Sequence, residues 1–419
     1  MKKLAGMLVA SLALFLGGCS FFTTTTTSTT VTTTDNENTD PVEIWTIEDL
    51  QSITSSDDVE LMADIDLQGV EWEPLCSHES PYAGTFNGNG HVISNMTITL
   101  KNTDFNGLFA SITGDVSNLT IENYSISYTS TFLTFAGGLA GELSGDVTNV
   151  FVDGDITIIN AMSSSYVGLL AGLIQAPVTS TMTATEFVPN TISGNQVIGS
   201  IDVQSKYFAY VGGLAGKTYN TEIIGNEVFA QIDVSCDIYR AYVGGLVGHH
   251  YGGVLIGYED YVDTSDIMIT DNTIISEITV SANGTQASIG GLIGYSQFGV
   301  MIDNFAVSTI SVSGSSLNIG AFLGEGWYGR LENSVSVTDV SVTLQEDQTL
   351  FVSSLAGFMN DEFTQETNYY LISANVTIDT VLGLETSKAS LSVETFYSTV
   401  LNWDETYFDF ALLMENLPE

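Results

Sequence analysis

The chain has 419 residues, of which 44% are hydrophobic, 40 are glycine and 6 are proline, so it is long and apolar enough to bury a large core. Fifty acidic residues face eight basic ones, and the formal net charge is −42 at pH 7. A surface this acidic repels nucleic acid and anionic lipid headgroups, which excludes both as expected partners. Cations, neutral glycans and basic proteins remain as candidates.

The chain begins with a segment typical of an export signal. Lys2 and Lys3 precede an apolar run over residues 4–16 that is too short to span a bilayer, and the sequence LGGC follows, ending at Cys19. Small residues before a cysteine resemble the lipobox of bacterial lipoproteins. The resemblance implies that the signal is removed and that Cys19 is lipid-modified, which would anchor the exported protein at the bacterial cell surface. An ordinary signal peptide with an incidental cysteine is the alternative.

A threonine-rich stretch follows the cysteine, with ten threonines between residues 23 and 34. It lacks apolar periodicity, which predicts a disordered tether. Folding is expected to start near Val42. Thr46 stands three residues before Asp49, a pattern that favours a short capped helix, and the alternation in VELMADIDL predicts a strand.

A glycine-rich hexapeptide recurs eight times, for example as VGGLAG at 211–216 and VGGLVG at 243–248. Its fourth position lies 30 to 33 residues from the next, except for two intervals of 44 and 46: Leu108, Leu139, Leu170, Leu214, Leu246, Leu292, Phe322 and Leu355. The repeat unit is therefore about 31 residues, and two units carry an insertion. A phosphate-binding loop is excluded, because such a loop occurs once or twice and precedes a helix.

Each unit also holds an asparagine just before an alternating β-branched strand: Asn118, Asn149, Asn195, Asn226, Asn272, Asn304, Asn333 and Asn368. Short strands of this kind cannot bury one face alone, but identical units stacked coil on coil share a core. We expect the leucines to stack along the interior and the asparagines to form one hydrogen-bonded ladder.

The sequence thus predicts an all-β fold, a parallel and right-handed β-helix (β-solenoid) of about nine coils with small N- and C-terminal caps. The caps would cover the strand edges that a solenoid exposes at its ends. The expected parts are the signal peptide, the lipidated cysteine with its tether, the N-terminal cap with the first coils, the repeats, and the C-terminal cap: residues 1–18, 19–41, 42–100, 101–380 and 381–419.

The repeated glycine frame resembles the GLUG motif of bacterial surface proteins. The leader TIEDLQSI…YAGTFNGNGHVISNMTI and the ending FYSTVLNWD…LP are similar to the flanking modules of the same proteins. The resemblance covers roughly residues 43–419 and implies a pectin-lyase-like parallel β-helix and a surface or adhesin-like role. Two features depart from the pattern, the serines of VSSLAG at 352–357 and Cys76 in the leader.

Enzymatic activity is the main alternative, because parallel β-helices also host polysaccharide lyases and glycosidases. A lyase needs convergent basic residues, but those after Lys3 are scattered over different units: Lys101, Lys206, Lys217, Arg240, Arg330 and Lys388. A glycosidase needs neighbouring acids. Asp115 and Asp146 occupy matching places, yet later units do not continue the column, so turn aspartates are expected. No catalytic residue is predicted.

Cysteine and metal chemistry find little support. Cys76 and Cys236 are far apart and are expected to be unpaired. His249 and His250 are adjacent, so in a strand they point to opposite faces and do not suit one metal ion. No cofactor or metal site is predicted, and weak calcium binding by the acidic surface remains open.

The second insertion, HHYGGVLIGYEDYVDTSD, offers the best candidate binding surface. Tyrosine faces can stack on sugar rings and carboxylates can bind hydroxyls or a cation, so the predicted ligand-binding loop consists of Tyr251, Tyr258, Asp260, Tyr261 and Asp263. The alternative is that this loop packs back on the rod. We expect a non-catalytic binding or adhesion module for an extracellular glycan or surface protein. A polysaccharide-active enzyme and a purely structural surface component are the alternatives.

Overall fold

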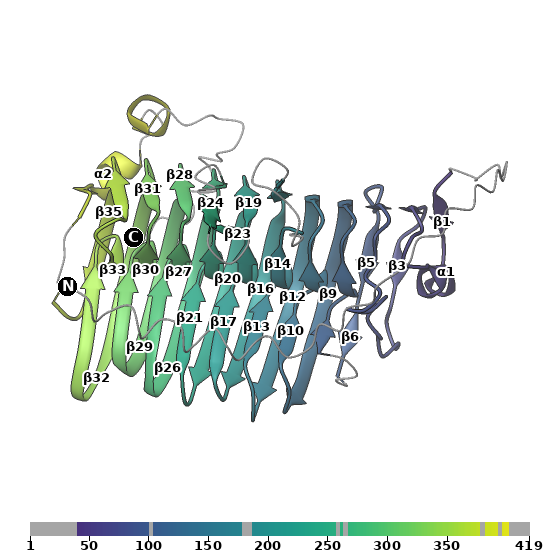
Figure 1. Ribbon diagram of the computed structural model, residues 1–419, viewed down its shortest axis with the longest axis horizontal. Coiled ribbons are helices and arrows are strands. Elements are labelled where there is room, and N and C mark those ends of the chain that lie inside the picture. Colours follow the sequence, from purple (N-terminus) through teal and green to yellow (C-terminus); the bar gives the residue numbers. More distant parts are fainter. Residues whose placement is uncertain are drawn as a thin grey trace. The chain divides into compact units, whose positions relative to one another are not determined.

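The computed structural model describes residues 40–99, 104–177, 187–256, 260–262, 267–377, 382–392 and 396–401. Apart from Asp40, the described residues belong to one compact unit, Pro41–Glu419. This unit is nearly all β. Its strands stack side by side in chain order, from purple to yellow in Figure 1, as a parallel β-solenoid.

Each repeat contributes strands to four columns. The longest strands form the first column: β9 Val116–Ser130, β12 Val147–Asn160, β16 Gln196–Ser205, β20 Glu227–Cys236, β26 Thr273–Gly290, β29 Phe305–Gly320, β32 Val335–Ser353 and β35 Tyr369–Ala374. The second column precedes the glycine corner: β7 Phe105–Asn106, β10 Thr134–Ala136, β13 Ser165–Gly168, β17 Phe208–Gly212 and β21 Arg240–Gly244. It continues in the last residues of β26, β29 and β32.

The third column follows the corner and forms a separate sheet: β8 Phe109–Ile112, β11 Ala140–Leu143, β14 Ala171–Gln175, β18 Ala215–Tyr219, β22 Val247–Tyr251, β27 Ile293–Gln297, β30 Leu323–Trp327 and β33 Ala356–Met359. The fourth column is short: β15 Asn190–Ser193, β19 Thr221–Ile224, β25 Met268–Thr270, β28 Val300–Ile302, β31 Arg330–Glu332 and β34 Thr364–Glu366. Within the described residues every pairing is parallel except that of β23 Val254–Ile256 with β24 Asp260–Val262.

The hexapeptide copies stack in register. Tyr210 pairs with Tyr242 and Lys217 pairs with His249, so AYVGGLAGK lies directly beside AYVGGLVGH. All eight residues at the fourth position of the motif are fully buried. The glycine that ends the motif is needed because the neighbouring backbone lies against it: a Cβ on Gly216 would lie 2.4 Å from the backbone nitrogen of Val167. The motif is a stacked corner.

The asparagines form two ladders, and the expectation of a single ladder was wrong. Asn195, Asn226, Asn272 and Asn304 are buried, and each backbone N–H donates to the side-chain oxygen of the next coil; the last steps run through Ser334 to Asn368. Side-chain amides add bonds of 2.9 to 3.0 Å between the asparagines.

Asn118 and Asn149 lie one position earlier in their coils, where the backbone is left-handed with φ of 52° and 56°, and they form a separate exposed ladder with Asn87. Asn333 has φ of 46° and also stands one position before the buried ladder, where Ser334 takes the asparagine's place. The left-handed position favours glycine and tolerates asparagine, and it holds Gly194 and Gly225 in units whose asparagine stands one position later.

The N-terminal part contains β1 Val42–Ile44, helix α1 Ile47–Ser52, β2 Val59–Leu61, β3 Ile65–Asp66, β4 Phe86–Asn87, β5 Val92–Ser94 and β6 Thr97–Ile98. The predicted capped helix is confirmed, since Thr46 Oγ1 accepts from the backbone of Asp49 and the Asp49 carboxylate accepts from Thr46. The stretch predicted as one strand forms two, β2 and β3.

At the other end lie β36 Leu384–Glu385, α2 Lys388–Leu391 and the π-helix η1 Phe396–Leu401. Leu391, Tyr397 and Leu401 form a second apolar cluster with Phe305 and Val335 of the long strands. The rest of the predicted C-terminal cap, residues 402–419, lies outside the described residues.

Candidate functional site

The predicted binding loop is described in part. Tyr251 ends β22 and is half-buried, and the insertion after it continues into the antiparallel pair β23 and β24, with Ile256 opposite Asp260 and Leu255 opposite Tyr261. The positions of Tyr258 and Asp263 lie outside the described residues, as does Cys19. The insertion therefore contains ordered hairpin backbone directly beside Tyr251.

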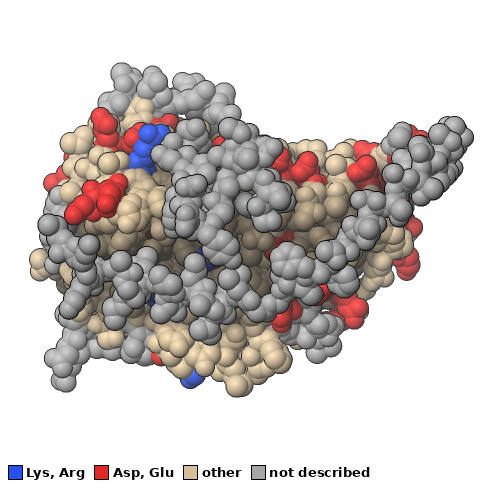
Figure 2. Space-filling model, viewed as in Figure 1, with Lys and Arg blue, Asp and Glu red and all other residues tan. Residues whose placement is uncertain are grey.

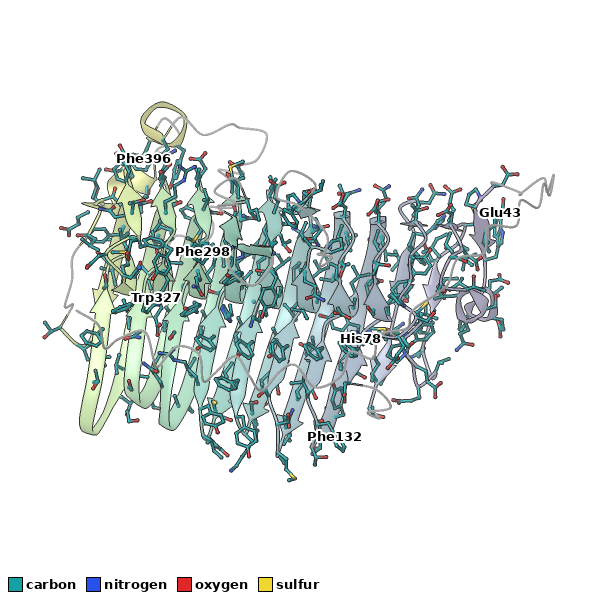
Figure 3. All side chains as sticks on the ribbon, viewed as in Figure 1. Glu43, His78, Phe132, Phe298, Trp327 and Phe396 are labelled. Atoms are coloured by element: carbon teal, nitrogen blue, oxygen red, sulfur yellow. The ribbon has the colours of Figure 1, made fainter. Side chains whose placement is uncertain are left out.

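Tyr251 belongs to a larger row of aromatic side chains. Its ring centroid lies 5.9 Å from that of Tyr219 and 5.7 Å from that of Phe298, and Phe298 stacks on Tyr328 at 5.1 Å. Trp327 extends the row, with centroid distances of 6.3 Å to Tyr328 and 5.2 Å to Phe358. We call these six residues the aromatic band: Tyr219, Tyr251, Phe298, Trp327, Tyr328 and Phe358. Figure 3 labels Phe298 and Trp327 within it.

The band is partly exposed, unlike the core. Tyr328 is 42% exposed and Phe358 is 38% exposed, and the other four rings are half-buried. The register explains the row, because Tyr219, Tyr251, Gln297 and Trp327 occupy equivalent positions in successive strands of the third column.

A second set of rings stacks along the strands that precede the corner. His78, Phe105, Phe135, Tyr166, Tyr210 and Tyr242 form a continuous ladder with centroid distances between 4.5 and 5.3 Å. These spacings follow the separation of neighbouring strands, about 4.8 Å. The ladder ends at Tyr242, because Ser288 and Asn318 follow it in register.

Lys217 lies between this ladder and the aromatic band. Its Nζ is 5.0 Å from the Tyr210 ring centroid and 4.6 Å from that of Tyr219, and the residue is 8% exposed. Burial lowers the pKa of the ammonium group to about 8. No described carboxylate lies within ion-pairing distance, so the rings are its only described charge-stabilising contacts.

His249 is the equivalent residue one coil further. Its ring stacks on Tyr210 and Tyr242 at 5.7 and 5.3 Å and meets Tyr295 edge-on at 4.7 Å. Both ring nitrogens are buried and have no hydrogen-bond partner among the described residues. Burial, followed by the charges of Lys217, His250 and Arg240, holds the imidazole pKa well below its ordinary value. The ring is therefore neutral at pH 7.

Arg240 reaches toward the same place from β21. One guanidinium nitrogen donates to the Tyr242 hydroxyl at 3.2 Å and another pairs with Glu325 at 2.8 Å, while Nε is buried without a described partner. Glu325 also accepts from Ser288 and Asn318, at 2.6 and 2.7 Å. The positive charge of Arg240 is thus balanced within the structure.

The fold therefore brings basic residues together that the sequence placed in different units. The expectation that no basic residues converge was wrong for Lys217 and Arg240, since both charges act on His249. Lys206 and Arg330 lie elsewhere, paired with Asp237 and Glu332. On the face in Figure 2, blue Lys and Arg atoms are few and red Asp and Glu atoms are more numerous. The sequence signal for this cluster was the tyrosine that recurs before the glycine corner, at Tyr210 and Tyr242, together with a polar residue directly after the corner, Lys217 or His249.

The acids considered for glycosidase chemistry have structural partners. Asp115 accepts from the backbone N–H of Asp146, and Asp146 accepts from that of Thr191. The buried Glu142 accepts from Ser111 Oγ at 3.1 Å and from Gln175 Nε2 at 2.7 Å. In the described part of the chain, no group of three His, Cys, Asp or Glu side chains is placed to hold a metal ion.

A separate groove of about 1040 Å³ crosses the outer face of the long strands. An apolar row and a parallel row of polar side chains line it, with Phe229 and Ile275 in the first and Gln231 and Glu277 in the second. This groove contains no basic residue and one aromatic ring, so its chemistry differs from that of the aromatic band.

Cys76 is a free cysteine, and burial raises the pKa of its thiol above the ordinary value. Burial raises the pKa of the Cys236 thiol to about 11, and the thiol donates to the backbone oxygen of Tyr207. Neither cysteine is therefore a nucleophile near neutral pH. No helix in the described ranges is both long and apolar enough to span a bilayer.

Comparison with known proteins gives limited information. No family model matches the chain. Over 118 aligned positions, which cover 24% of the chain, the sequence is 32% identical to Halomucin of Haloquadratum walsbyi, and the match spans 1% of that protein's length. The crystal structure of "a putative immunoglobulin A1 protease" from Bacteroides ovatus superposes with a TM-score of 0.41 at 16% identity, over 86% of this chain and 88% of that one. These likenesses leave the function to be argued from the site.

Proposed function

We propose that this protein is a lipid-anchored, cell-surface β-solenoid of the GLUG type that binds an extracellular carbohydrate without cleaving it. The observation that carries the proposal is the aromatic band, a row of six partly exposed rings on successive coils. Sugar rings present an apolar C–H face that packs on aromatic faces, while their hydroxyls stay in water. A row that advances one strand at a time suits a linear polymer.

Anchoring is supported by the sequence of the N-terminus. The basic and apolar segment ending in LGGC at Cys19 fits a lipoprotein signal, and the threonine-rich stretch after it fits a spacer. The net charge of −42 favours neutral or cation-bridged ligands over nucleic acid. Weak calcium binding by the acidic surface is part of the proposal and needs no dedicated site.

A binding role is favoured over catalysis by the hydroxyls and carboxylates near the band. Burial raises the pKa of Tyr210 and Tyr242 above the ordinary value, so these hydroxyls stay protonated at neutral pH. Glu325 and Glu142 are held by hydrogen bonds inside the structure. The observation that favours an enzyme instead is Lys217, because an amine with a pKa of about 8 could act as the base of a lyase.

Co-sedimentation with insoluble polysaccharides tests the proposal. The purified protein is mixed with cellulose, chitin, cell walls and matrix proteins, with calcium or with a chelator, and soluble sugar is assayed in the same tubes. Retention without release of sugar is expected. Release of sugar would replace the proposal with the enzyme, and the absence of retention on every material would leave a structural component.

Point variants locate the binding surface. Tyr328→Ala and Trp327→Ala remove rings of the band and are expected to weaken retention by about tenfold or more. Phe132→Ala is the matched control, because this ring is 69% exposed and is not part of the band (Figure 3). Phe229→Ala tests the groove on the long strands. Loss of retention in Phe229→Ala with normal retention in Tyr328→Ala would place the ligand in that groove.

Deletion of residues 252–264 tests the contribution of the insertion. The hairpin β23–β24 follows Tyr251 directly, so we expect its removal to weaken retention while leaving the repeat core folded. Unchanged retention would restrict the binding surface to the rings on the third strand column.

A further inference from the structure

The cluster between the ring ladder and the aromatic band holds hydrogen-bond donors that the described protein does not use. Lys217 has no carboxylate partner, His249 has two buried ring nitrogens without partners, and Arg240 Nε is buried without one. Unpaired buried polar groups of this kind each destabilise the folded protein. Two such residues, His249 and Arg240, lie beside a lysine that has ring contacts but no described carboxylate partner, and together they indicate a place for a ligand group.

We infer that Lys217 and His249 form a subsite for a singly charged anionic group on a sugar ring, with the carboxylate of a uronic acid as the group that fits best. The inference rests on the proposed function, because it assigns the class of carbohydrate that the aromatic band binds. The Lys217 ammonium would supply the charge, and an N–H of His249 a directed hydrogen bond.

The charge balance of the cluster argues for a monoanion. Arg240 is neutralised by Glu325 at 2.8 Å, and His249 is neutral because it is buried among Lys217, Arg240 and aromatic rings. Among the described residues, the positive charge of Lys217 has no counter-ion. A carboxylate or a sulfate ester would balance it, whereas a phosphate monoester with two charges would not.

The position of Lys217 connects this subsite with the aromatic band. The ammonium lies 4.6 Å from the ring of Tyr219, which is the first residue of the band and contacts Tyr251 in a tilted arrangement. A sugar on Tyr219 would therefore bring a ring substituent to Lys217. Tyr210, 5.0 Å away on the other side, encloses the same position with a second ring.

The fold itself does not need a charge at this place. The position accepts apolar side chains, because Leu173 precedes Lys217 in register and Tyr295 follows His249. The charged residues further along the same position, Glu142 and Glu325, have hydrogen-bond partners, whereas Lys217 has no described carboxylate partner. A buried lysine costs free energy unless it is paired. Its presence beside unused imidazole nitrogens fits a role in binding better than a role in packing.

The test compares polygalacturonate with its fully methyl-esterified form, which has the same backbone without the charge, and with dextran sulfate. Affinities are measured by titration calorimetry for the natural protein, Lys217→Met and Lys217→Arg. The control is Lys206→Met, which removes a lysine that pairs with Asp237 at the surface. Because Leu173 occupies the equivalent position, Lys217→Met is expected to fold, and its melting curve checks this.

We expect Lys217→Met to bind polygalacturonate about 10- to 100-fold more weakly, as for loss of a charged hydrogen bond. Lys217→Arg should recover part of the affinity, Lys206→Met should match the natural protein, and the methyl ester should bind all four alike. His249→Leu is the second variant, with an expected loss of about tenfold. Equal affinity of the natural protein and Lys217→Met for polygalacturonate would overturn the inference, as would a preference for dextran sulfate.

The two proposals fail in distinguishable ways. If carbohydrate binding itself is wrong, the natural protein binds neither polygalacturonate nor its ester, and Tyr328→Ala changes nothing. If only the anionic subsite is wrong, the protein binds a glycan, Tyr328→Ala weakens that binding, and Lys217→Met does not.

Discussion

Tyr124 and Gly138 share one space inside the solenoid. A Cβ on Gly138 would lie 2.6 Å from Cε1 of Tyr124, whose hydroxyl donates to the backbone oxygen of Leu169 at 2.9 Å. In the next coil the sizes are reversed, because Leu169 stands where Gly138 stands and Gly154 pairs with Tyr124. Gly199, one coil further, also faces Leu169, with its Cβ position 3.2 Å from Leu169 Cδ2. The large residue changes sides between the two coils, which explains the irregular motif VGLLAG.

Replacement of Gly138 by alanine therefore overpacks the interior. We expect Gly138→Ala to lower the free energy of unfolding by about 1–3 kcal/mol, since the added methyl meets both the Tyr124 ring and the Leu169 backbone. Urea unfolding followed by circular dichroism measures the change.

A double-mutant cycle with Tyr124→Leu provides the control. In the Tyr124→Leu background the ring is gone, so Gly138→Ala should cost less than it does in the natural protein. An equal cost in both backgrounds would show that the ring is not what excludes the methyl group.

A substitution in the buried asparagine ladder is expected to destabilise the protein more than a substitution in the exposed ladder. Asn272 accepts from the backbone and side chain of Asn226 and donates to Asn304 and to the backbone oxygens of Ile223 and Thr270. Asn272→Ala leaves several of these buried groups unpaired and is expected to cost about 2–4 kcal/mol.

Asn149→Gly is the matched control for the ladder. Asn149 is exposed and has φ of 56°, which glycine adopts without strain, so this change should cost less than about 1 kcal/mol. Thermal unfolding of both variants decides the matter, and equal losses would contradict the distinction between the two ladders.

The architecture was readable from the sequence because the landmarks are repeated. The leucines at the fourth position of the motif recur at a nearly constant interval, and such recurrence is explained only by stacking of equivalent coils. The capped helix at Thr46 was readable from one local pattern for a similar reason, since its hydrogen bonds join residues three apart. The sequence did not predict which position of the corner each asparagine occupies. Asparagines one position apart belong to different ladders, one exposed and one buried.

The cluster at Lys217 could not be derived from the sequence in the same way. Lys217, Arg240 and His249 belong to different strands, and only the register Lys217–His249 brings them beside Tyr210 and Tyr242. Their importance depends on burial and on missing partners, and neither is visible in a linear pattern. A repeat alignment that tracked the residue directly after each corner would have marked Lys217 as the polar departure from Leu173.

Lys217 predicts an unusual dependence of stability on pH. Its pKa is about 8 in the folded state against 10.5 for a free lysine, so the unfolded chain binds more protons between these values. The free-energy cost of burying the charged ammonium group is therefore complete below pH 8 and disappears as the pH rises to about 10.5. The difference between the two pKa values corresponds to about 3 kcal/mol of unfolding free energy. The contacts with Tyr210 and Tyr219 offset part of this.

We therefore expect Lys217→Met to raise the free energy of unfolding by about 1–2 kcal/mol at pH 7 and by less at pH 10.5. Urea unfolding at both pH values measures the difference, and Lys206→Met, which changes an exposed lysine, should shift neither. A loss of stability at pH 7 would mean that the ring contacts outweigh the cost of burial.

His250 predicts the response to acid. The residue is fully buried, its Nδ1 lies 2.8 Å from Thr218 Oγ1, and burial lowers its pKa from 6.5 to about 4. Between these values the unfolded chain binds the proton and the folded protein does not, so stability falls as the pH drops from 6.5 to 4, by about 3 kcal/mol in total. His250→Gln, which keeps an acceptor for Thr218, should flatten this part of the curve. Unfolding free energies at pH 4, 5, 6 and 7 test the prediction. Parallel curves for the variant and the natural protein would assign the acid sensitivity to His249 or to the carboxylates, because all other titratable groups are unchanged in the comparison.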